Sequence, residues 1–133
     1  NWGTVRIGVC DAEARFSWGL SLAAGKLLRG SRDADGRINS FDAQPPAGFP
    51  NGDGTQLMKD EAGQPASLAG RANGAVIEVL FDHDEGALSF RVNGGPPLPA
   101  LKGFPTGAAL RPWLYCSNAG SGCQQASFVR PYL

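Results

Sequence analysis

The residue types able to do chemistry are few in this sequence, and the first group to consider is an acidic segment. Residues 31–42 (SRDADGRINSFD) place oxygen-bearing side chains at the first, third, fifth, ninth and twelfth positions, with Gly36 at the sixth. This is the ligand spacing of a calcium-binding EF-hand loop. However, Ser31 replaces the first aspartate, Asp42 replaces the bidentate glutamate, and the flanking sequence has no helical periodicity. We therefore expect a solvated loop here and no metal site.

The second candidate is the turn 82–86 (DHDEG), which contains His83, the single histidine of the chain. Any nucleophile that depends on histidine would have to be built there, yet the composition is that of a hairpin turn ending in glycine. The sequence has no Gly-x-Ser-x-Gly elbow, phosphate loop, dinucleotide fingerprint or His-Glu-x-x-His zinc motif. Carboxylates paired by folding, as in sandwich glycosidases, remain open, but no feature suggests them. We predict a non-enzyme without a cofactor.

Cysteine usage and charge restrict the compartment and the partners. Cys10, Cys116 and Cys123 are an odd number at irregular spacing; Cys116 and Cys123 could close a small loop, but free thiols in the reducing cytoplasm are the simpler expectation. Twelve basic and twelve acidic residues cancel, which disfavours nucleic acid and anionic membranes as partners. No apolar run is long enough to cross a bilayer. The start without methionine or signal peptide suggests a piece of a larger polypeptide or complex.

The elements that must position any site are short strands, because nineteen glycines and ten prolines are spread along the chain as turn residues. Alternation of apolar and polar residues predicts strands over residues 5–9, 18–22, 88–93, 110–116 and 124–130. The apolar run 75–81 predicts a central strand covered on both faces. Residues 31–70 read as a long irregular loop region with at most one or two short strands. Residues 1–133 are expected to form a single all-β domain, a two-sheet antiparallel sandwich.

Two further patterns refine this expectation. Asn93-Gly94 is a strong turn signal, and Pro96, Pro97 and Pro99 place the next segment at a sheet edge or in a loop. Large aromatic side chains within strand patterns are expected to pack in the core, namely Trp18, Phe81, Phe90 and Trp113.

The best-defined motif is residues 74–94 (GAVIEVLFDHDEGALSFRVNG), which resembles the signature of SPRY domains, the core of the B30.2 module. That signature is an apolar strand, an Asp-x-Asp-x-Gly turn, Leu-Ser-Phe and Asn-Gly. Further elements similar to those of the family are residues 5–10 (VRIGVC), 17–20 (SWGL), 101–105 (LKGFP) and 110–112 (LRP). The resemblance implies a concanavalin-like sandwich that lacks the one or two strands usually preceding the Ile-Gly-Val strand.

SPRY domains are protein–protein interaction modules, so the resemblance implies an adaptor or scaffold that recognises a peptide or protein surface through loops at one end. Those joined to SOCS boxes bind peptides with a Gly-Thr pair before the Ile-Gly-Val strand and a tryptophan before the last strand. Gly3-Thr4 matches the pair, but residues 118–122 (NAGSG) lack the aromatic. We expect Phe49 of the long loop to supply it. The expected partner-binding residues are Gly3, Thr4, Phe49, Asn118, Gly120 and Ser121.

Two alternatives stay open at this point. The domain could have a purely structural role, packed inside a large intracellular assembly, which the missing first strands would favour. It could also be a glycan-binding sandwich, since lectins share the architecture. The sugar contacts would then be Asn51, Asp53, Asn118 and Ser121.

Overall fold

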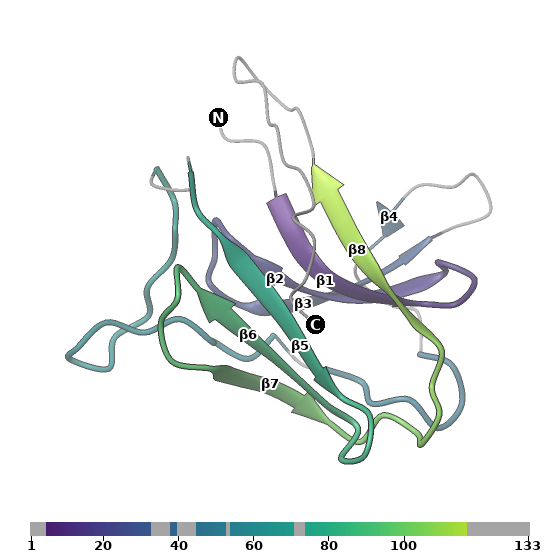
Figure 1. The fold of residues 1–133 in the computed structure, drawn as a ribbon. Helices are drawn as coiled ribbons and strands as arrows, with labels where there is room; N and C mark the ends of the chain where they lie inside the picture. Colours follow the sequence, from purple (N-terminus) through teal and green to yellow (C-terminus); the bar gives the residue numbers. More distant parts are fainter. Residues whose placement is uncertain (1–4, 33–37, 40–44, 53, 71–73, 117–133) are drawn as a thin grey trace.

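The computed structural model describes residues 5–32, 38–39, 45–52, 54–70 and 74–116, and these ranges contain strands and turns but no helix (Figure 1). None of the described residues therefore forms a helix long and apolar enough to span a membrane. The strands are β1 (Val5–Asp11), β2 (Phe16–Ser21), β3 (Leu27–Arg32), β4 (Ile38–Asn39), β5 (Ile77–Asp82), β6 (Ala87–Val92), β7 (Leu98–Lys102) and β8 (Leu110–Cys116). They form two antiparallel sheets, in the orders β4-β3-β2-β1-β8 and β5-β6-β7. The predicted all-β, two-sheet antiparallel sandwich is confirmed.

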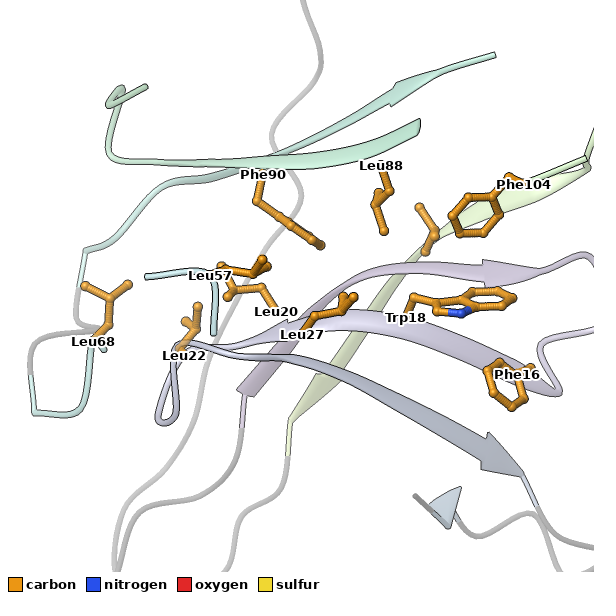
Figure 2. Packing of buried hydrophobic residues seen from close by; sticks show 11 residues of the cluster. Phe16, Trp18, Leu20, Leu22, Leu27, Leu57, Leu68, Leu88, Phe90 and Phe104 are labelled. Carbon is orange, nitrogen blue, oxygen red and sulfur yellow. The ribbon is translucent and has the colours of Figure 1, made fainter. Parts of the chain in front are cut away.

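The core lies between the two sheets and follows the period-two alternation of the strands (Figure 2). Trp18 and Leu20 of β2 face Leu88 and Phe90 of β6, and all four side chains are fully buried. Ser89, which lies between Leu88 and Phe90 in β6, is only half-buried because it points to the other face of its sheet. Burial of these large apolar side chains is the main force that holds the two sheets together.

Strand β5 has an exposed outward face, although its apolar run predicts a strand covered on both faces. Within the described residues it pairs only with β6, from Ile77 opposite Val92 to Asp82 opposite Ala87. Ile77, Val79 and Phe81 pack against the core, whereas Val76, of the opposite parity, is 57% exposed. The prediction of cover on both faces was wrong because Val76 is apolar and yet faces outward. Its presence made the run continuously apolar, which is the pattern of a strand buried on both faces.

The turn between β5 and β6 is a structural element built on its own backbone. The Asp82 carboxylate accepts hydrogen bonds from the backbone N–H groups of Asp84 (2.9 Å) and Glu85 (3.1 Å). Gly86 has a φ of 61°, and a Cβ there would lie 2.3 Å from the carbonyl oxygen of Phe104. Glycine is therefore required at this position by both conformation and space.

The Asn-Gly turn after β6 forms as predicted, with φ values of 50° at Asn93 and 73° at Gly94. Asn93 is also a tie between segments: its backbone N–H donates to the Val76 carbonyl (2.8 Å), and its Oδ1 accepts from the Val76 N–H (2.8 Å). The chain then enters β7, which contains Pro99 and pairs within the described residues only with β6. The predicted edge or loop placement of the proline segment is confirmed.

We expect Asn93→Ala to lower the free energy of unfolding by about 1–2 kcal/mol, because it removes the Oδ1 acceptor and leaves a Cβ at positive φ without a local polar partner. Asn93→Gly relieves the backbone but still loses the acceptor, so it should cost less. Urea unfolding followed by circular dichroism compares the two variants. Equal losses would contradict the contribution assigned to the backbone conformation.

Residues 45–52 and 54–70, which are described parts of the long region 31–70, contain no named strand, and a glutamine connects this segment to the β2–β3 turn. The Gln56 Nε2 group lies 3.2 Å from the carbonyl oxygen of Ala24, 3.3 Å from that of Gly25, and 3.0 Å from those of Met58 and Ala66. Its two N–H donors are thus shared among four acceptors from three segments of the chain. This amide connects the β2–β3 turn to the long loop.

Candidate functional site

Among the predicted partner-binding residues, Phe49 lies in the described part of the chain, whereas Gly3, Thr4, Asn118, Gly120 and Ser121 lie outside it. The described residues next to them in the sequence, Val5 and Cys116, are paired across β1 and β8. Of the alternative sugar contacts, Asn51 is exposed, and Asp53 is also outside the described residues. Most of the EF-hand-like segment 31–42 and the predicted strand 124–130 also lie outside the described residues.

Phe49 is half-buried and packs onto the core. Its ring stacks on Trp18, with ring centroids 5.7 Å apart and planes at 14°, and meets the edge of Phe104 at 6.1 Å. The indole N–H of Trp18 donates to the neighbouring Pro50 carbonyl (3.1 Å), which holds the loop in place. Phe49 therefore has a packing role, and replacing it would uncover Trp18 as well as remove a contact surface.

Phe49 also lies away from the end at which Val5 and Cys116 pair. Trp18, on which it stacks, is opposite Val9, four residues along β1 from Val5. This corresponds to about 13 Å along the strand. Figure 2 shows the same separation, with Trp18 and Phe104 at one side of the core and Leu22, whose N–H donates to the Val5 carbonyl, at the other.

A second group of side chains lies on the outer face of the larger sheet, the face turned away from the core. Tyr115 of β8 is opposite Arg6 of β1, and Trp113 is opposite Gly8. The Trp113 and Tyr115 rings are stacked, with centroids 6.1 Å apart and planes at 9°, and the Arg6 guanidinium carbon lies 5.9 Å from the Tyr115 ring centre. Both rings are half-buried and therefore still reach solvent.

Trp113 is thus not a core residue, contrary to the sequence prediction. It has the opposite parity to Leu114 in β8 and lies over the backbone of the glycines in β1 and β2. A Cβ added to Gly19 would be 3.1 Å from the Trp113 ring, so the missing side chain makes room for the indole. The alternation within 110–116 already contained this information, because Trp113 and Tyr115 share one face of the strand.

The electrostatic state of Arg6 is unusual for a surface arginine. Burial lowers the pKa of its guanidinium, and the interaction with Tyr115 opposes that change by raising the pKa. Arginine nevertheless remains cationic in proteins. Its Nε is buried and has no hydrogen-bond partner among the residues that the structure describes, and the same is true of Nη1 of Arg29 in β3. Arg111, exposed on the same face of β8 as Trp113, adds a second positive charge.

A shallow hollow of about 480 Å³ lies beside the β2–β3 turn, lined by Ala24, Asp60, Pro65, Ala66, Ser67 and Ala69. Its one carboxylate is already engaged, since the Asp60 Oδ1 accepts from the backbone N–H groups of Ala62 and Gln64, both at 2.9 Å. Within the described ranges, no three His, Cys, Asp or Glu side chains are grouped so that they could hold a metal ion. Cys10 is buried.

The outer-face group and the Phe49 stack are therefore the two arrangements that the described residues offer for binding. The first presents planar rings and a cation toward solvent, and the second is mainly engaged in packing. Comparisons of the chain with models of protein families, with curated proteins and with solved structures found no match.

Proposed function

We propose that this protein is a protein–protein interaction module that recognises a peptide or protein surface at the end of the sandwich where β1 begins and β8 ends. The observation that supports this most is the stacked pair Trp113–Tyr115 with Arg6 beside it, half-buried and open to solvent. Tryptophan, tyrosine and arginine are the residue types that contribute most binding energy in protein interfaces.

The framework around these residues favours binding over catalysis. β1 and β8 pair continuously from Val5 opposite Cys116 to Asp11 opposite Leu110. Side chains on two paired strands lose little conformational freedom when a partner docks, which is how a rigid scaffold contributes to affinity. This arrangement supplies a recognition surface of two planar rings and a cation.

We also propose that the domain belongs to the SPRY family and acts in the cytoplasm as part of a larger polypeptide or complex. The signature segment 74–94 supplies β5, the Asp82–Gly86 turn and β6, as such a signature would require. An odd number of cysteines at irregular spacing agrees with a reducing compartment. A purely structural packing role is the rival that the experiment below must distinguish.

The test is an affinity capture from cell lysate, quantified by mass spectrometry, with wild type and Tyr115→Ala. We expect Tyr115→Ala to lose partners by about ten-fold, since interface aromatics commonly contribute more than 1 kcal/mol. Val76→Ala is the matched control, because Val76 is exposed and lies just before β5 of the other sheet. Thr4→Ala tests the loop end separately.

Proteins retained equally by wild type, Tyr115→Ala and Thr4→Ala would contradict recognition at this end of the sandwich. They would favour a domain that only packs inside an assembly. Circular dichroism of each variant shows whether the fold has been kept.

A further inference from the structure

We propose that the arginine–aromatic row, defined as Arg6, Arg111, Trp113 and Tyr115, binds an extended acidic segment of a partner protein. In this complex, carboxylates of the segment pair with the arginines and an aromatic side chain packs on the stacked rings. This inference rests on the proposed binding function and adds to it the surface and the chemistry of the partner.

The geometry of β8 favours an extended ligand. Arg111, Trp113 and Tyr115 alternate along one strand, so their side chains stand on one face about 7 Å apart. An extended peptide repeats its own side chains on one face with the same spacing. A segment lying along β8 can therefore meet successive members of the row with every second residue.

The charges determine which extended segment is favoured. The row has a cation at each end, Arg111 and Arg6, and no carboxylate between them. The ion pairs of the described residues join Arg15 to Glu13 (3.3 Å) and Arg91 to Glu78 (3.2 Å), and neither involves this row. Carboxylates are the groups that complement arginine best, through charge and paired hydrogen bonds.

The partial burial of Arg6 strengthens this preference. Its guanidinium is held against the Tyr115 ring, and its Nε is shielded from water and has no acceptor within the described part of the chain. A cation that has already lost part of its hydration gains more from a carboxylate at its remaining donors than a fully solvated one. Two cations are too few for binding to nucleic acid, which depends on neutralising many phosphates.

The experiment measures fluorescence anisotropy with labelled synthetic peptides made of three repeats of Glu-Ser-Tyr-Ser, in which Glu and Tyr fall on one face. Peptides with Gln or Lys in place of Glu are the ligand controls. We expect the Glu peptide to bind about ten-fold more tightly than the Gln peptide, and the Lys peptide not to bind. Arg6→Gln should reduce affinity for the Glu peptide about ten-fold and leave that for the Gln peptide unchanged.

Arg91→Gln is the matched control, because it removes the same charge from the other sheet. Arg6→Lys keeps the charge but loses the planar guanidinium, so it should retain part of the preference for the Glu peptide over the Gln peptide. This variant also provides a test if Arg6→Gln does not fold. Equal binding of the Glu and Gln peptides, or equal losses for Arg6→Gln and Arg91→Gln, would overturn the proposal.

The outcome is separable from that of the lysate experiment. If no peptide binds while proteins captured from lysate still depend on Tyr115, the acidic-segment assignment fails and the binding function stands. If the peptides do not bind and capture is also independent of Tyr115, both fail.

Discussion

Trp18→Ala is expected to lower the free energy of unfolding by about 3–5 kcal/mol, which is much of the stability of a typical domain. Trp18 is completely buried, and its indole contacts three rings. Phe16 of the same strand lies at 4.9 Å, and Phe104 and Phe49 from two other segments lie at 5.0 Å and 5.7 Å between centroids. Truncation leaves a cavity at the centre of this group and removes the hydrogen bond to the Pro50 carbonyl. Urea unfolding monitored by far-ultraviolet circular dichroism measures the loss.

Trp113→Ala is the matched control, since it deletes the same side chain from the outer face of the same sheet. Because Trp113 is half-buried, we expect a loss of about 1–2 kcal/mol. Trp18→Phe keeps an aromatic ring in the core and should fall between the two. A loss for Trp113→Ala as large as that for Trp18→Ala would contradict the assignment of the core to the opposite face.

Gln56→Leu is expected to lower the free energy of unfolding by about 2–4 kcal/mol, although a loop glutamine would ordinarily be a neutral site. Its Nε2 is the shared donor for the carbonyls of Ala24, Gly25, Met58 and Ala66. The carbonyls of Gly25 and Met58 also accept backbone N–H groups and keep them in this variant. The larger cost therefore arises at the carbonyls of Ala24 and Ala66, which a leucine side chain leaves facing an apolar group. Gln64→Leu, at an exposed position of the same loop, is the control and should change stability by less than about 0.5 kcal/mol.

Gln56→Glu tests the same interpretation, because the stability of this variant should depend on pH. A carboxylate among carbonyl oxygens is repelled, so the pKa of the new side chain is raised in the folded state above its unfolded value. The relative stability of this variant should therefore be highest in acid and fall as pH rises through that raised pKa. Chemical unfolding at several pH values tests this, and a penalty independent of pH would show that the carbonyls do not surround the side chain.

The strands were largely predictable because their determinants are local. Alternation placed β1 and β8, and the Asp-x-Asp-x-Gly and Asn-Gly motifs placed the turns on either side of β6. The position of a strand within its sheet is a tertiary property, and the apolar run of β5 did not reveal that it pairs, among the described residues, only with β6. The composition of a strand indicates which side chains it could bury, but its neighbours in the folded sheets determine which side chains are buried.

The candidate site was less predictable, for the same reason. Phe49 was expected as a contact residue, but its ring stacks on Trp18, a residue far away in the sequence. The outer-face stack depends on Arg6 meeting Tyr115, and no local pattern connects them. Gln56 gave no signal either, since its acceptors are backbone carbonyls that only the folded chain brings together.

The pairing of β1 with β8 has a consequence for the time at which the proposed binding surface forms (Figure 1). Val5 cannot find its partner until Cys116 has been synthesised, which at ribosomal speed takes roughly 6 to 22 s. Until then the β8-facing edge of β1 lacks its partner, and edges of this kind are prone to wrong pairing. Since Arg6 and Tyr115 come from these two strands, the proposed ligand surface can form only after β8 has been synthesised and has paired with β1.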